Sequence, residues 1–92
     1  MVEEILKERK NTHGQFHDQA LVAQRLKCAA NDGIIICNTE LTDVEKEAID
    51  MILHKIARVI AGDPHFEDHW SDIAGYATLV PIHNKAGKEK WQ

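Results

Sequence analysis

The chain has 92 residues, which is the size of a single domain. Its hydrophobic fraction of 43% and charged fraction of 28% are those of an ordinary globular protein, and they exclude a disordered tail and a collagen-like fibre. Fifteen acidic against eleven basic residues give a net charge of −4, which disfavours broad contact with duplex nucleic acid, and no apolar run reaches the roughly 18–20 residues that a membrane span needs.

The N-terminal segment predicts a short helix over residues 2–9, because acidic residues stand at its start and basic residues at its end. The Asn11-Thr12-His13-Gly14 segment is expected to end it. No apolar run follows the acidic start, so the sequence predicts no signal peptide and a cytoplasmic protein. In that compartment Cys28 and Cys37 are expected to be reduced and inert.

A second helix is predicted over residues 16–30, where Phe16, Ala23 and Leu26 follow helical spacing. The Asn31-Asp32-Gly33 sequence is a strong stop signal. The three isoleucines at 34–36 cannot form a sheet alone, so we expect an extended segment that fills the core.

The third helix has the clearest start in the sequence, because Thr42 and Glu45 form a capping box. It is predicted over 43–61 as the central and most buried helix, and Gly62-Asp63-Pro64 ends it. A fourth helix is predicted over 66–79, with Trp70 on its buried face and Pro81 closing it.

The expected fold is therefore all-α, a small bundle of three or four helices in one domain over residues 1–80, with a flexible basic tail over 81–92. The central helix is apolar over most of its circumference. A domain this small is expected to bury the remaining surface in a homo-oligomer.

Two polar stripes are candidates for chemistry. On the third helix the stripe is spaced three, four and four residues apart, and a lysine flanks it; on the fourth helix two aspartates stand four apart near a tyrosine. If the two helices pack antiparallel, their carboxylates form an oxygen-rich site suited to Mg²⁺, and the cations hold phosphate oxygens. The alternative is a set of ordinary surface ion pairs. The residues are Glu47, Asp50, His54, Lys55, Arg58, Asp68, Asp72 and Tyr76.

A third candidate is the loop at His13 and Gly14. His13 and His17 stand four apart, which permits a transition-metal site but without a third ligand. A phosphate or base contact by His13 at the start of a helix is the better hypothesis. Trp70 and Tyr76 offer faces for stacking on a base, although Trp70 alternatively fills the core.

Several blocks of the sequence resemble a family of small, uncharacterised phage and prophage proteins. The resemblance runs from about residue 8 to residue 80 and implies a phage-derived, helical, intracellular protein. It implies no activity by itself. The blocks are Thr12-His13-Gly14 with Phe16, Met51-Ile52-Leu53-His54-Lys55-Ile56-Ala57-Arg58, Gly62-Asp63-Pro64, and Asp68-His69-Trp70-Ser71-Asp72-Ile73-Ala74-Gly75-Tyr76.

A more distant resemblance is to the all-α nucleotide pyrophosphohydrolases of the MazG type, which hold Mg²⁺ on acidic helix motifs. Glu47-x-x-Asp50 is similar to such a motif. Asp68-x-x-x-Asp72 has a different spacing, and no Glu-Glu-x-x-Glu motif precedes it.

These features predict a nucleotide-handling phage protein, with Mg²⁺-dependent cleavage of a nucleoside triphosphate as the leading hypothesis. Glu47, Asp50, Asp68 and Asp72 would hold the metal, with Glu47, Asp50 and Asp72 catalytic. A group of ligand-binding residues would contact the phosphates, base and sugar. One alternative is a non-catalytic protein that sequesters a nucleotide signal or antagonises a host protein; another is a structural helical module. The ligand-binding residues are His13, Gly14, His54, Lys55, Arg58, Trp70 and Tyr76.

Overall fold

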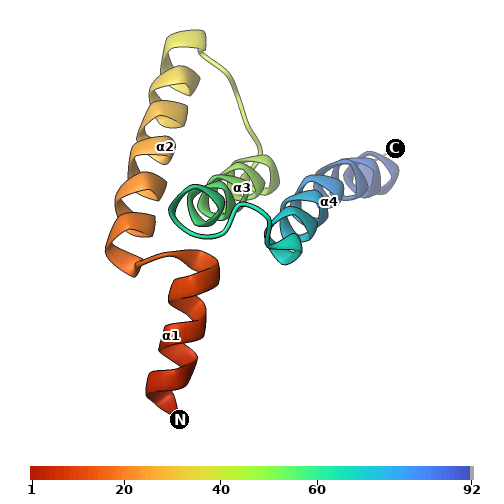
Figure 1. The fold of residues 1–92 in the computed structure, drawn as a ribbon. Helices are drawn as coiled ribbons and strands as arrows, with labels where there is room; N and C mark the ends of the chain where they lie inside the picture. The colour runs from red at the N-terminus through yellow and green to blue at the C-terminus, as the bar shows by residue number, and fades with distance from the viewer. Residues whose placement is uncertain (92) are drawn as a thin grey trace.

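The computed structural model describes the backbone of residues 1–91 and the side chains of residues 1–86. It confirms the all-α class: the described backbone forms four helices and no strand (Figure 1). None of the described helices is both long and apolar enough to cross a membrane. The helices are α1 (Val2–His13), α2 (Phe16–Cys37), α3 (Asp43–Ala61) and α4 (Glu67–Trp91).

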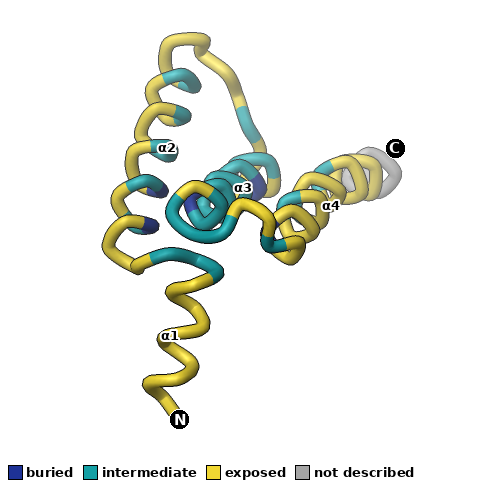
Figure 2. The backbone as a smooth tube through the Cα atoms, in the orientation of Figure 1, coloured by how far each residue is buried: buried dark blue, intermediate teal, exposed yellow. Residues whose placement is uncertain are grey.

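Helix α3 lies at the centre, with α2 against one side and α4 against the other (Figure 1). Helix α1 projects away from the other three and contains no buried residue (Figure 2). Among the side chains that the structure describes, the buried hydrophobic ones are three alanines, Ala23 on α2 and Ala48 and Ala57 on α3. The helices therefore approach closely through small residues, and little large apolar surface is removed from solvent.

The predicted start of α3 is confirmed. The Thr42 N–H donates to Glu45 Oε1 at 2.9 Å, and the Glu45 N–H donates to Thr42 Oγ1 at 3.2 Å. Both bonds of the capping box thus satisfy amides that the first helical turn leaves without partners. This reciprocal cap fixes the start of the helix on which the other helices pack.

The α1–α2 connection crosses the α3–α4 connection, and glycine is required on both sides of the crossing. Gly14 has a φ of 79°, and a Cβ there would collide with the Ala61 carbonyl. A Cβ at Gly62 would collide with the Thr12 carbonyl. The two connections therefore touch backbone to backbone, which sets the position of α1 relative to α3 and α4.

The predicted end of the second helix was wrong, because α2 continues through Asn31-Asp32-Gly33 to Cys37. Its actual cap is Asn38, which adopts the left-handed conformation, and the Thr39 N–H donates to the Ile34 carbonyl at 3.0 Å. The isoleucines at 34–36 are helical rather than extended, and Ile35 and Ile36 are exposed. A glycine inside a helix costs only about 1 kcal/mol, so the helix passes it and ends at the next strong cap.

The predicted end of the fourth helix was also wrong, because α4 runs through Pro81 to Trp91. Proline removes one helical hydrogen bond, the one that the Ala77 carbonyl would accept. Ala77 is exposed, so water can satisfy that carbonyl. The expectation of a flexible tail over 81–92 falls partly on residue 92 and on the side chains beyond Ala86, which lie outside the described residues.

The buried face of α4 differs from the predicted one by a single position. Trp70 is 54% exposed, whereas His69 is 1% exposed and is the largest fully buried side chain. The Trp70 indole N–H donates to the Pro64 carbonyl at 2.8 Å, which holds the ring over the turn before α4 rather than in the core.

The crossing predicts opposite effects of alanine at two glycines. Gly14→Ala should lower the free energy of unfolding by about 2 kcal/mol or more, because it combines a positive φ with a backbone collision. Gly33→Ala is the matched control: it lies in α2 with open space around it and should raise that free energy by about 1 kcal/mol. Urea unfolding followed by circular dichroism measures both. Equal stabilities of the two variants would contradict the crossing.

Candidate functional site

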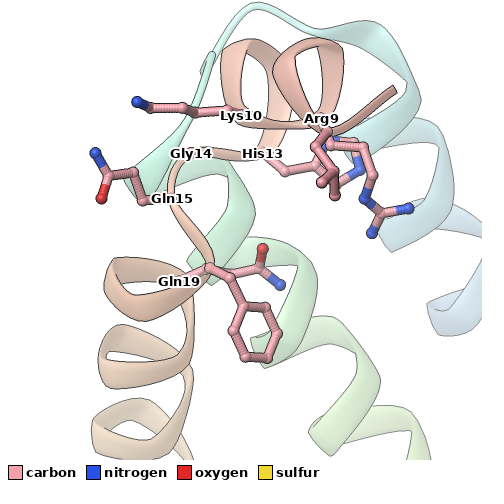
Figure 3. A pocket seen from close by; sticks show the side chains of 8 residues that line it. Arg9, Lys10, His13, Gly14, Gln15 and Gln19 are labelled. Carbon is pink, nitrogen blue, oxygen red and sulfur yellow. The ribbon is translucent and has the colours of Figure 1, made fainter. Parts of the chain in front are cut away.

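A hollow of the described surface lies where α1 turns into α2 (Figure 3). Its volume is about 460 Å³, within the usual range for small-molecule sites. It is built by the last turns of α1, the two-residue connection and the first turn of α2. The lining residues are Leu6, Arg9, Lys10, His13, Gly14, Gln15, Phe16 and Gln19.

The hollow is electrostatically positive. Gln15 precedes α2 in an extended conformation and its side chain does not cap the helix, so the first amides of α2 have no side-chain partner. The positive end of the α2 dipole therefore points at the hollow, beside the cations Arg9 and Lys10. Asp18, the acidic residue of the first turn, is exposed and does not line it. This arrangement is suited to an anion.

His13 forms one wall of the hollow and is uncharged at neutral pH. Burial lowers the pKa of His13 from 6.5 to about 4, and the positive charge of Arg58 and then the neighbouring His69 act in the same direction. Its ring lies edge-on to His69 at a centroid distance of 4.8 Å and tilted to Phe66 at 6.1 Å. His13 thus offers a neutral hydrogen-bonding group within a positively charged neighbourhood.

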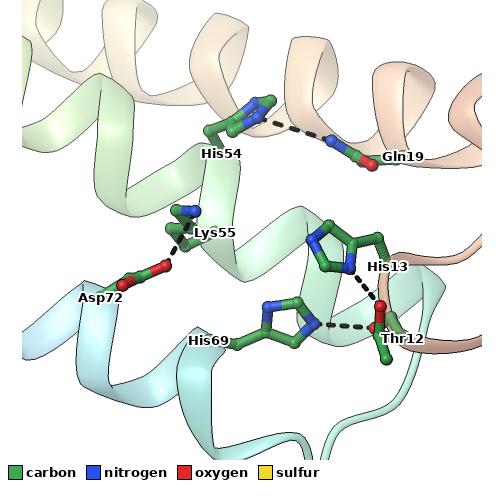
Figure 4. A network of polar contacts seen from close by, with 7 residues as sticks. All are labelled: Thr12, His13, Gln19, His54, Lys55, His69 and Asp72. Carbon is green, nitrogen blue, oxygen red and sulfur yellow. Dashed lines mark hydrogen bonds and ion pairs between the residues drawn. The ribbon is translucent and has the colours of Figure 1, made fainter. Parts of the chain in front are cut away.

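His69 links α4 to the C-terminal end of α1 (Figure 4). Its Nε2 lies 2.8 Å from the Thr12 carbonyl oxygen. A carbonyl only accepts, so Nε2 must carry the proton and donate it. The Asp63 N–H donates to the same oxygen at 3.0 Å, and the Thr12 hydroxyl shares a hydrogen bond of 2.5 Å with His13 Nδ1. These bonds join α1, the α3–α4 connection and α4 at one point.

Arg58 lies near the same cluster and is incompletely paired. Its Nε is buried and has no hydrogen-bond partner among the described residues. Burial lowers the pKa of Arg58, as does the positive charge of Arg9, whereas Asp72 and Tyr76 act in the opposite direction. An anion within hydrogen-bonding distance would pair with this guanidinium and stabilise its charged form.

The polar stripes of α3 and α4 meet through a salt bridge. Lys55 Nζ lies 3.0 Å from Asp72 Oδ2, and the lysine side chain is nearly buried (Figure 4). The hydrogen bond and charge of Lys55 lower the pKa of Asp72. Asp50 pairs instead along its own helix, with Lys46 Nζ at 2.7 Å.

The predicted magnesium ligands are therefore dispersed. Asp50 and Asp72 are each held by a lysine, and Glu47 and Asp68 are exposed. Among the described residues, no group of three histidine, cysteine, aspartate or glutamate side chains is placed to hold one metal ion. The described donor set of a single chain does not fit Mg²⁺, which requires near-octahedral oxygen ligation.

His54, which was predicted as a site residue, lies beside Gln19, which was not. His54 Nε2 lies 3.5 Å from Gln19 Nε2, and burial followed by the charge of Arg58 lowers the pKa of His54. Gln19 was not predicted as a site residue, yet it is 5% exposed and lines the hollow. Its signal was its position four residues before Ala23, on the side of α2 that faces α3, where a glutamine requires a polar partner.

The remaining predicted residues lie elsewhere or have a structural role. Gly14 lines the hollow but is chiefly the close contact at the crossing. Tyr76 lines a different hollow, between α3 and α4, and Trp70 lies over the turn before α4. Arg9 and Lys10 line the hollow and were not singled out from the sequence, where they are simply the basic end of a helix.

Comparison with known proteins gives a family but no function. The family model described as a domain of unknown function (DUF6378) matches residues 2–82. No curated protein and no solved structure matches the chain significantly.

The burial of His13 predicts a stability that falls on acidification. An unfolded histidine takes up a proton near pH 6.5, whereas folded His13 resists it until about pH 4, so the folded state loses stability as the pH falls from 7 towards 4. Melting temperatures at pH 7 and pH 5 should differ less in His13→Asn than in the wild type. His54 contributes with the same sign, so a smaller slope remains in the variant.

His17→Asn is the control for this measurement, because His17 is exposed on the first turn of α2. It should keep the wild-type dependence on pH. If His13→Asn and His17→Asn showed the same slope, His13 would not be the group responsible.

Proposed function

We propose that this chain, which belongs to the DUF6378 family, binds a nucleotide by its phosphates in the hollow at the α1–α2 junction. The observation that carries the proposal is that Arg9, Lys10 and the uncapped N-terminus of α2 all line one hollow. Each of these groups attracts an anion, and together they match a group with several negative oxygens.

The neighbourhood beneath the hollow supports a phosphate rather than a metal. Positive charge is in excess there, since the charge of Arg9 acts on Arg58, and of the two groups that raise the pKa of Arg58 only Asp72 is a carboxylate. His13 is neutral in the free protein, and a bound anion would favour its protonation and gain a further donor. Phosphate binding is therefore expected to strengthen as the pH falls towards 5.

The rest of the hollow fits the remainder of a nucleotide. Phe16 is 79% exposed on its rim, which leaves an aromatic face free for stacking on a base. Leu6 adds apolar surface to the lining. The distant resemblance to MazG-type proteins agrees with a nucleotide ligand, and the resemblance to phage proteins agrees with a role in the cytoplasm of an infected host cell.

Cleavage of the nucleotide is the second candidate function. The contact between Lys55 and Asp72 favours it, because it joins the polar stripes of α3 and α4 that were predicted to form the catalytic site. The described carboxylates of one chain do not form a magnesium site, so we derive no metal-dependent step from them. Turnover itself decides between a binding protein and an enzyme.

The binding site is tested with a charge-neutralising variant. A pool of nucleoside triphosphates, and separately inorganic pyrophosphate, should raise the melting temperature of the wild type. Arg9→Gln should weaken binding about tenfold or more, because it removes a cation from the hollow. Lys7→Gln is the matched control, since Lys7 is an exposed cation of α1 that does not line the hollow, and it should bind as the wild type does. An unchanged melting temperature for every probe, or equal losses in both variants, would contradict the proposal.

Turnover is tested by incubating catalytic amounts of protein with the same pool and Mg²⁺ or Mn²⁺, and resolving the products by chromatography. A binding protein leaves the pool unchanged. Monophosphate and pyrophosphate in large excess over protein would establish a pyrophosphohydrolase, in which case Asp72→Asn should abolish turnover without changing the helical circular dichroism spectrum.

A further inference from the structure

Helix α1 presents an apolar stripe that no described residue covers. Val2, Ile5 and Leu6 follow the spacing of one helical face, and each is more than half exposed. Helix α1 is held to the rest of the chain only at its C-terminal end, by the bonds to Thr12, and its N-terminal half projects outwards (Figure 2). An isolated helix of 12 residues is marginal in water, so its stability depends on a packing partner.

The whole chain exposes more surface than a folded monomer of its size. Its accessible surface is 7047 Å², against about 5,400 Å² for a compact protein of this mass. The excess of about 1,600 Å² is twice the ~800 Å² that each partner contributes to a standard stable interface. The radius of gyration, 15.8 Å, likewise exceeds the ~12 Å of a compact chain of this length.

A second hollow, between α3 and α4, offers a complementary apolar surface. We call it the α3–α4 groove; it has a volume of about 350 Å³ and an almost wholly apolar interior. Acidic residues of α3 and a histidine of α4 stand at its rim. The groove residues are Asp43, Val44, Glu47, Ala48, Met51, Tyr76, Leu79 and His83.

The chain's own α1 cannot fill this groove. Helix α1 joins the fold at the C-terminal end of α3, where Gly14 touches Ala61, and it leaves in the direction away from α3 (Figure 1). The groove begins at the opposite end of α3, and Met51 is already ten residues, about 15 Å, from Ala61. The apolar stripe of α1 and the apolar groove thus lie out of reach of each other within one chain.

We propose that the chain forms a two-fold symmetric dimer in which α1 of each copy lies in the α3–α4 groove of the other. The reciprocal exchange places Val2 and Ile5 of one copy against Val44 and Leu79 of its partner, and it closes on itself without leaving a free groove. The groove residues do not line the hollow at the α1–α2 junction, so the dimer can be tested without any nucleotide.

The mass in solution gives the first test. Light scattering after size exclusion, without any nucleotide, should give twice the 10.4 kDa of the chain. Ile5→Glu on α1 and Leu79→Glu in the groove should each give the mass of one chain, because each places a charge in the apolar contact. Ile36→Glu is the matched control: Ile36 is 81% exposed on α2, outside the proposed contact, and this variant should stay dimeric.

The pairing itself is tested by a disulfide between two different chains. In a background with Cys28→Ser and Cys37→Ser, a chain carrying Ile5→Cys is mixed with one carrying Leu79→Cys and oxidised. The proposal expects a covalent dimer that contains one chain of each kind. A matched mixture with Ile36→Cys in place of Leu79→Cys should give little of that product.

Several results would overturn the dimer. A wild-type chain that is monomeric at tens of micromolar excludes it, and a mass that grows without limit excludes the closed two-fold form. Dissociation by Ile36→Glu but not by Ile5→Glu assigns the interface to α2 instead. Since no nucleotide is present, none of these results measures binding at the hollow, which the Arg9→Gln variant tests separately.

Discussion

The Thr12 carbonyl oxygen is the point on which the arrangement of this small protein depends. It accepts one hydrogen bond from the buried His69 side chain and another from the Asp63 backbone, and so ties the end of α1 to α4 and to the α3–α4 connection. The buried hydrophobic residues are alanines, which contribute little burial, so directed hydrogen bonds and close glycine contacts have to set the helix positions. Gly14 and Gly62 permit this because they allow the two connections to touch.

The same crossing determines the electrostatics of the candidate site. It brings His13 against His69 and within the field of Arg58, so that His13 stays neutral while cations gather round it. A protein with a net charge of −4 thereby keeps a locally positive hollow. The separation of a positive site from a negative surface favours a small anion over a long polyanion such as duplex DNA.

The sequence predicted the helix ends that neighbouring residues determine. It did not predict those where a small local cost is outweighed by packing or solvation. The capping box at Thr42 and the end of α3 at Gly62 were predictable because each is set by neighbouring residues. Gly33 and Pro81 were read as helix ends, but their costs are a few kcal/mol at most and packing or solvation outweighs them. Trp70 was placed in the core because it is apolar, whereas the rotation of α4 that lets His69 reach Thr12 puts it outside. For the site, residue chemistry pointed to His13 and Arg58, but not to Arg9, Lys10 or Gln19, because the hollow exists only through the turn at Gly14.

Helix α1 links the two proposals physically. The apolar stripe at its N-terminal half and the cations at its C-terminal half share one short helix, which is anchored at a single end. Packing Ile5 against a second copy would fix the helix and hold Arg9 in position over the hollow, so a nucleotide would bind a pre-ordered site at lower entropic cost. By the reciprocity of binding free energies, an anion held by Arg9 would strengthen the dimer to the same extent.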